Sequence, residues 1–262
     1  MSTLTFALRD SSTMLRRNLL HMRRYPSLTL MLVGIPVILL LLFVYVFGGT
    51  LGAGLGPTGG RAEYANYVTP GILLITVASA TQGTAISVAM DMAEGIIARF
   101  RTMAIFRPSV LTGHVVGSVF QTMVSLAAVT GAALLVGFRP TADAVEWLAA
   151  IGVLTMVTVA VTWLSVALGL VTRSVETASN LPMPLVLLPF LGSGFVPTDS
   201  MPTPVRLFAD YQPLTPVMET LRGLLLGSGI GVNGLLAVAW CAVITVGCFC
   251  WAKALYNRPR TA

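Results

Sequence analysis

Charge is scarce in this sequence, and the charged residues avoid the long apolar runs. Only 10% of the 262 residues are Asp, Glu, Lys or Arg, whereas soluble domains carry about 25%. A helix needs roughly 17 to 25 mainly apolar residues to cross a bilayer. Six runs without these charged residues reach that length: 28–47, 69–90, 110–136, 147–171, 181–197 and 235–252. We therefore expect an all-α membrane protein, organised as a single domain over 1–262 with six transmembrane helices.

The chain also lacks the residues that two common energy sources require. Lysine occurs once, at Lys253, so the phosphate-binding motif G-x-x-x-x-G-K-[ST] cannot occur. Ion-driven carriers usually hold the coupling ion with ionisable residues inside the spans. The six runs contain no Asp, Glu, Lys or Arg, and Asp91 lies just beyond the second run, so an ion-driven carrier is disfavoured. Sodium sites lined by backbone carbonyls stay open as an alternative. Because the chain lacks an energy source of its own, we expect that a partner protein drives transport through it.

Catalytic and metal-binding clusters are missing as well. A serine nucleophile needs a partner base. We expect no base beside Ser193 in the fifth run, because the two histidines lie elsewhere: His21 is near the N-terminus and His114 is near the start of the third run. We interpret Ser193 as a small residue that eases helix packing. Three cysteines lie in the last run, where we interpret them as small buried apolar residues: Cys241, Cys248 and Cys250. We expect no catalytic residue, cofactor or metal site in this chain.

Lysine and arginine alternate between the two sides of the predicted spans. Twelve of the 16 lie in 1–27, 91–109, 172–180 and 253–262. Because cytoplasmic loops carry the excess of these residues, both termini and 91–109 are predicted to be cytoplasmic. The net charge of +6 then reflects membrane topology, and no nucleic-acid partner is expected. Arginine outnumbers lysine fifteen to one, which indicates a high-GC bacterial genome and a bacterial plasma membrane.

Residues 1–27 are predicted to form a helix that lies along the membrane surface. Leucines at helical spacing form one stripe and most arginines lie off it, as in a helix placed among lipid headgroups. The alternative is a solvated basic leader. The arginines expected at the interface with lipid are Arg16, Arg17, Arg23 and Arg24.

The stretch "EGIIARFRTMAIFRP" places arginines between two apolar runs. Helical spacing over 94–106 gives one apolar face, and leaves Ile105 and Phe106 off that face. Such an element can dock in a groove of a partner protein or contact lipid alone, and the residues themselves leave both open. They also leave open which face would dock. The residues that would carry docking are Glu94, Gly95, Arg99, Phe100, Arg101, Ile105 and Phe106.

Proline is concentrated late in the chain, where eight of the 15 prolines fall between 181 and 216. Two short stretches follow that have helical spacing but are too polar to span, which favours a re-entrant helix pair over 198–227 on the outer side. An ordinary surface loop is the alternative. Glu219 and Arg222 stand three residues apart and are expected to pair, more often for structure than for binding substrate. The candidate gate residues are Pro197, Asp199, Pro202, Pro213, Glu219 and Arg222.

Four motifs resemble those of the membrane subunit of type-2 ABC exporters, in particular the daunorubicin-resistance permeases of actinobacteria. They are "YANYVTPGILL", "EGIIARFRTMAIFRP", "FLGSGFVPTDSMP" and "QPLTPVMETLRGLL". The likeness extends over nearly the whole chain. Two departures are Gln212, where Asn commonly precedes the P-L-T, and the order "LGSG".

This resemblance implies that 94–106 is a coupling helix, that 1–27 is a connecting helix and that 198–227 closes the outer end of the pathway. Two ATP-binding subunits would hold ATP and magnesium, and a second permease copy or a related permease would complete the exporter. The implied substrate is a hydrophobic or amphipathic drug or lipid. The alternatives are an ion channel or uncoupled membrane scaffold, or an intramembrane enzyme.

Overall fold

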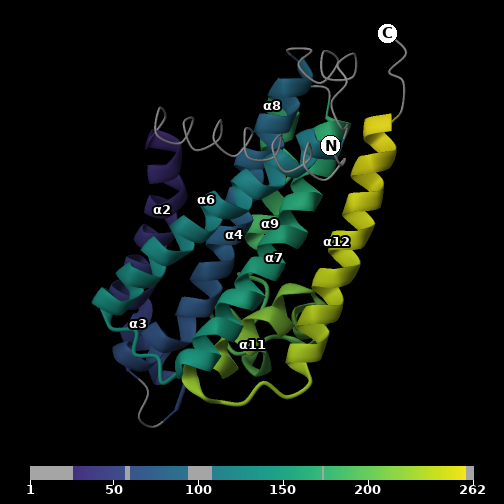
Figure 1. The fold of residues 1–262 in the computed structure, drawn as a ribbon. Helices are drawn as coiled ribbons and strands as arrows, with labels where there is room; N and C mark the ends of the chain where they lie inside the picture. The colour runs from purple at the N-terminus through teal and green to yellow at the C-terminus, as the bar shows by residue number, and fades with distance from the viewer. Residues whose placement is uncertain (1–25, 57–59, 94–107, 173, 258–262) are drawn as a thin grey trace.

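The computed structural model describes residues 26–56, 60–93, 108–172 and 174–257, and this part of the chain contains helices and no strand (Figure 1). The first element, α2 (Pro26–Leu41), continues through the π-helical turn η1 (Leu42–Phe47) into α3 (Gly48–Ala53). The other long helices are α4 (Arg61–Ala93), α6 (Pro108–Val136), α7 (Ala144–Val171) and α12 (Asn233–Asn257). The short ones are α8 (Val175–Asn180), α9 (Met183–Leu187), η2 (Thr198–Ser200), α10 (Thr203–Tyr211) and α11 (Leu214–Leu226). The predicted all-α fold is confirmed.

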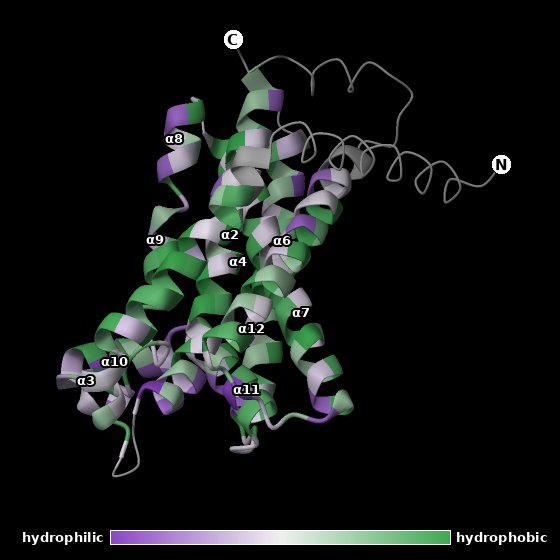
Figure 2. Ribbon diagram, turned by 90° about the vertical axis from the view of Figure 1, so that its left-hand side faces the viewer, coloured by the Kyte–Doolittle hydropathy of each residue, from purple (hydrophilic) through white to green (hydrophobic). Residues whose placement is uncertain are grey.

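Within the described residues, five helical stretches are long and apolar enough to cross a membrane, which supports a multi-pass membrane protein. Hydrophilic residues gather toward the two ends of the helix bundle, including α8 and α11, and hydrophobic residues cover most of its middle (Figure 2). The five stretches match five of the six predicted runs: Leu30–Ala53, Arg61–Ala93, Thr112–Val136, Ala144–Val171 and Asn233–Tyr256.

The predicted fifth span, 181–197, is not one continuous helix. After α8 the chain forms only the five residues of α9 and then a series of turns up to Phe195. Pro182, Pro184 and Pro189 fall in this segment, and each lacks the backbone N–H that continues a helical ladder. The segment runs from α8 at the upper end of the bundle, past α9, to α10 and α11 at the lower end (Figures 1 and 2). The expected six continuous helices are therefore corrected to five and one broken segment.

The central element of the bundle is α4. It contacts α2, α6, α7, α8, α9 and α11, and most of its side chains from Tyr64 to Ala89 are buried. Gln82 of α4 donates to the carbonyl of Ser179 in α8 at 2.7 Å. In contrast, α2 and α12 expose many large apolar side chains, as helices that face lipid do. The cysteine prediction holds only for Cys241, because Cys250 on α12 is exposed.

Helices α6 and α7 are neighbours, as the short connection between the third and fourth runs predicts. The connection ends in a capping box, in which the Asp143 carboxylate accepts from the Glu146 N–H at 2.7 Å and Glu146 accepts from the Asp143 N–H at 2.8 Å. This reciprocal pair satisfies two backbone donors at the start of α7. The Thr141 N–H also donates to the Leu225 carbonyl at 3.0 Å, which joins the connection to α11.

Helices α4 and α7 approach each other closely at Gly169. A Cβ atom added there would lie 2.7 Å from the Ala85 carbonyl oxygen and 2.9 Å from the Val88 Cβ. Small residues permit this kind of close backbone approach between membrane helices. Gly152, on the same helix α7, has nothing within 4 Å of the equivalent position.

We expect Gly169→Ala to destabilise the protein, because the added methyl group meets backbone atoms of α4 that cannot move independently. Overpacking of this kind costs about 1–3 kcal/mol. The measurement is the thermal unfolding midpoint of the purified protein in detergent, with Gly152→Ala as the matched control, which should keep the wild-type midpoint. Equal midpoints for the two variants would contradict the close α4–α7 contact.

Candidate functional site

The turns that follow α9 do not continue a helical ladder, and tyrosines of α4 donate hydrogen bonds to their carbonyl groups. The Tyr67 hydroxyl donates to the Ser193 carbonyl at 2.9 Å, and the Tyr64 hydroxyl donates to the Phe195 carbonyl at 3.1 Å. Tyr64 and Tyr67 stand three residues apart, so both hydroxyls leave the same face of α4. A buried carbonyl without a partner is costly, so these two bonds stabilise the broken segment where it lies against α4.

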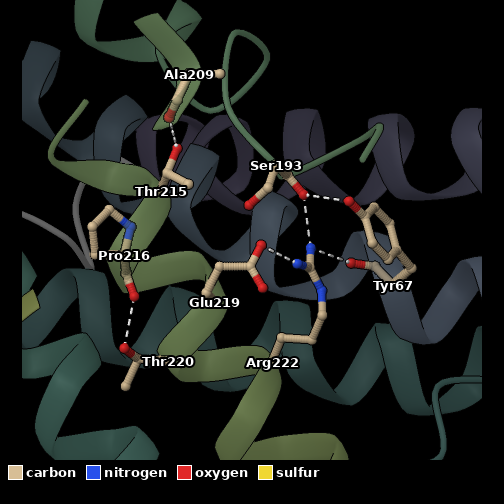
Figure 3. A network of polar contacts seen from close by, with 8 residues as sticks. All are labelled: Tyr67, Ser193, Ala209, Thr215, Pro216, Glu219, Thr220 and Arg222. Carbon is tan, nitrogen blue, oxygen red and sulfur yellow. Dashed lines mark hydrogen bonds and ion pairs between the residues drawn. The ribbon is translucent and has the colours of Figure 1, made fainter. Parts of the chain in front are cut away.

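Arg222 of α11 joins the same group (Figure 3). Its Nη2 donates to the Ser193 carbonyl at 2.7 Å and to the Tyr67 carbonyl at 3.3 Å, while Nη1 donates to the Glu219 carboxylate at 2.5 Å. The guanidinium also lies over the Tyr67 ring, 3.9 Å from its centroid. One side chain therefore connects α11 with α4 and with the broken segment. We call the set Tyr64, Tyr67, Ser193, Glu219 and Arg222 the lower-end joint.

The charge of Arg222 is buried but compensated. Its side chain is 10% exposed, whereas that of Glu219 is 31% exposed. A buried cation is tolerated only when it is paired and hydrogen-bonded, and Arg222 has a carboxylate, two carbonyls and an aromatic face as partners. The planar guanidinium can serve all of them at once, which the point charge of a lysine cannot.

A corner between α10 and α11 positions the helix that carries Arg222. The Thr215 hydroxyl donates to the Ala209 carbonyl at 2.6 Å, which closes the corner. Gln212, at the end of α10, is buried and donates from Nε2 to the Leu188 carbonyl at 3.1 Å. A third carbonyl of the broken segment thus receives a side-chain donor, here from the α10–α11 corner.

Glycines allow the broken segment to lie directly against α4. A Cβ atom on Gly71 of α4 would lie 2.7 Å from the Gly194 carbonyl oxygen and 2.9 Å from its Cα. Any side chain at Gly71 would therefore push away the segment that carries Ser193. Within "GSGF", Gly194 lies at the crossing with α4, whereas a Cβ atom on Gly192 would meet the side chains of Gln212, Met218 and Thr215.

The π-helical turn η1 packs on the other side of the segment through aromatic rings. The Phe43 and Phe195 ring centroids are 4.5 Å apart, and Phe190 stacks on Phe195 with centroids 4.5 Å apart. π-Helical turns often occur at functional sites. The broken segment thus contacts η1 as well as α4.

Three buried polar atoms of this region have no hydrogen-bond partner among the described residues: Ser193 Oγ, Gln212 Oε1 and Arg222 Nε. His114 is bonded to Asp91 and is not a partner of the Ser193 hydroxyl. The lower-end joint therefore offers hydrogen-bonding groups without an activated nucleophile. Its contacts connect α4, α11 and the broken segment.

The six predicted gate residues lie in or beside η2, α10 and α11. Glu219 and Arg222 form the predicted pair. Asp199 instead contacts Arg206, 2.7 Å away, at an exposed position. The three prolines precede helices as cap residues: Pro197, Pro202 and Pro213. The docking residues within 94–106 and the four interfacial arginines lie outside the described residues.

Sequence reasoning missed most of the lower-end joint. Tyr64 and Tyr67 were visible as a three-residue spacing in "YANY", but nothing indicated that their hydroxyls would reach backbone carbonyls more than 120 residues away. Ser193 contributes its carbonyl, which is common to every residue type and carries no sequence signal. The buried contact between Asp91 and His114 was also missed.

Comparison with known proteins gives a consistent result. Residues 10–226 match the family described as ABC-2 type transporter. The chain is 30% identical over 218 residues to the "Daunorubicin resistance ABC transporter permease protein DrrB1" of Streptomyces coeruleorubidus, covering 82% of this chain and 75% of that protein. It is 23% identical over 191 residues to the "Probable doxorubicin resistance ABC transporter permease protein DrrC" of Mycobacterium tuberculosis, covering 72% and 69%.

We expect Arg222→Ala to destabilise the protein by roughly 3 kcal/mol, near the lower limit for breaking a buried ion pair, because Glu219 stays partly solvated. The matched control is Arg206→Ala. Arg206 also contacts carboxylates but is 48% exposed, so its loss should cost less than about 1 kcal/mol. Denaturant unfolding in mixed micelles measures both variants. Similar losses for the two arginines would show that Arg222 does not hold the joint.

Proposed function

This chain belongs to the ABC-2 type transporter family as a membrane permease subunit, and we propose that a separate ATP-binding subunit drives it to export hydrophobic or amphipathic compounds. The observation that carries the proposal is the family match over 10–226 in a chain whose single lysine excludes a P-loop. ATP and magnesium would bind to the partner, present in two copies. A second permease copy or a related permease would complete the pathway.

We propose that the chain crosses the membrane six times, with the broken segment as the fifth crossing. The ends of α4 and α12 and the start of α6 lie at the upper end of the bundle, with α8, and α11 lies at the lower end (Figure 1). The excess of Lys and Arg in the stretches that flank the upper end favours a cytoplasmic location for that end and for both termini. The lower end would then face outward, with 198–227 as the re-entrant gate. Residues 1–27 would lie along the inner leaflet and contact lipid.

In this arrangement the segment 94–106 would dock on the ATP-binding subunit. It connects α4 with α6, so a push on it acts on the ends of two helices. Glu94, Arg99 and Arg101 would contact charged groups of the partner, and either Phe100 or Ile105 with Phe106 would enter its groove. ATP binding would close the two partner subunits, and the helices would carry that motion toward the lower end.

The lower-end joint supports a gate that moves as one body. Because Arg222 binds the Ser193 carbonyl and the Tyr67 carbonyl together, α11 cannot move away from α4 without losing charged hydrogen bonds. A displacement of α4 would therefore move α11 as well. Daunorubicin and doxorubicin, named for the relatives, are the first substrates to test.

We expect Arg101→Glu to abolish co-purification with the ATP-binding subunit, because it reverses the charge that would meet an acidic rim. The measurement is the amount of ATP-binding subunit retained by the tagged permease, together with ATP-dependent daunorubicin uptake into inverted vesicles. The control Arg206→Glu makes the same reversal on α10 at the opposite end and should leave the amount of retained ATP-binding subunit unchanged.

Retention of the partner and of uptake by Arg101→Glu would exclude the docking role of Arg101. Ion conductance from the purified chain alone in a planar bilayer would instead support a channel. Catalytic turnover by the chain alone would support an enzyme.

A further inference from the structure

A buried polar contact joins α4 and α6 near the end of the bundle opposite the lower-end joint. His114 Nε2 is hydrogen-bonded to Asp91 Oδ2 at 2.8 Å, and each residue is only 7% exposed. Asp91 lies in the last turn of α4, which ends at Ala93, and His114 lies in the second turn of α6, which begins at Pro108. The pair therefore links the two helices that flank 94–107.

Local structure does not favour Asp91 at this position. The C-terminal end of a helix carries partial negative charge, so a carboxylate in the last turn is disfavoured. Burial adds a second penalty to the charged form. The contact with His114 offsets part of both penalties. Helix stability and apolar packing alone would be served better by a neutral residue, so the position of Asp91 points to a requirement beyond folding.

The surroundings of the pair are packed. Val88 of α4, Val115 of α6, Leu170 of α7 and Tyr256 of α12 belong to one buried apolar cluster at this end. Asp91 lies one helical turn from Val88, and His114 is adjacent to Val115. The pair thus sits beside a core shared by four helices, where a displacement of either helix end meets close-packed neighbours.

A second polar link joins the same helices further from 94–107. The Thr84 hydroxyl donates to the Ser118 hydroxyl at 2.9 Å. Ser118 follows His114 by one turn of α6, and Thr84 precedes Asp91 by two turns of α4. This neutral link connects the same two helices but carries no charge, and it provides an internal comparison for the Asp91–His114 contact.

We propose that Asp91 and His114 are positioning residues that fasten the ends of α4 and α6 to each other, so that both helices follow a displacement of the segment between them. The inference rests on the proposed role of 94–106 in docking the ATP-binding subunit. With the contact in place, a push on the segment moves the two helices as a unit. Without the Asp91–His114 contact, a displacement of the segment separates the two helix ends from each other and does not move the rest of the bundle.

The test uses the permease co-expressed with its ATP-binding subunit and reconstituted in liposomes. The readout is the stimulation of ATP hydrolysis that depends on the permease, with co-purification and the thermal midpoint measured on the same samples. The variants are His114→Ala, Asp91→Asn and the exchange Asp91→His with His114→Asp. Ser118→Ala, which removes the neutral link, is the matched control.

We expect His114→Ala to keep its partner and its fold but to lose about tenfold in stimulation, within the usual range of coupling free energies. Asp91→Asn, which retains a hydrogen-bonding group, should lose less. The exchange should recover stimulation to within about twofold of wild type, because a carboxylate and an imidazole still face each other. Ser118→Ala should match wild type.

Wild-type stimulation by His114→Ala would overturn the proposal, and so would an equal loss in Ser118→Ala or an exchange that recovers nothing. If the single variants fail to fold and the exchange folds, the pair serves stability alone and the positioning role is overturned. A wild-type permease that neither retains an ATP-binding subunit nor stimulates ATP hydrolysis would instead overturn the proposed function, and this inference with it.

Discussion

The structure depends on supplying hydrogen-bond donors to a backbone that prolines have broken inside an apolar bundle. Lipid offers no donors, so irregular backbone at membrane depth must find its partners within the protein. Here the donors are side chains: Gln82, Tyr67 and Tyr64 of α4 reach the carbonyls of Ser179, Ser193 and Phe195. These bonds fix the end of α8 and the last turns of the broken segment to α4, and the weak helix propensity of the segment becomes tolerable.

That requirement explains why a buried arginine occurs in α11. The Ser193 carbonyl accepts from both Tyr67 and Arg222, and only a residue with several donors in a plane can bind it, the Tyr67 carbonyl and Glu219 together. The arginine fixes the short helix relative to α4, while the Gly71–Gly194 approach brings the backbones close enough for its reach. The charge of Arg222, the glycines at the Gly71–Gly194 approach and the prolines of the broken segment all belong to this one contact region, although each alone would destabilise a membrane helix.

The sequence predicted the helical class, five continuous spans and the Glu219–Arg222 pair, because these depend on composition and on spacing within one helix. The expectation of a helical span over 181–197 was wrong, since the apolar run indicates burial but its prolines interrupt the helical hydrogen bonding. Nor did the sequence predict contacts such as Tyr64 with Phe195 or Asp91 with His114, because these join distant parts of the chain. His114 had been considered only as a catalytic base, so its pairing with a carboxylate beyond the second run was not sought.

Helix α4 takes part in polar connections at both ends of the bundle, so one helix links the two ends. Its first turns carry Tyr64 and Tyr67, which hold the broken segment and α11, and its last turn carries Asp91, which holds α6. Between them the helix is buried among neighbours, and α7 approaches it closely at Gly169, next to Ala85 and Val88. A close-packed helix transmits displacement along its length because packed interiors are hardly compressible. The same residues that donate to the broken segment therefore attach the α11 end of the bundle to the helix whose other end precedes 94–106, the segment proposed to dock on the ATP-binding subunit.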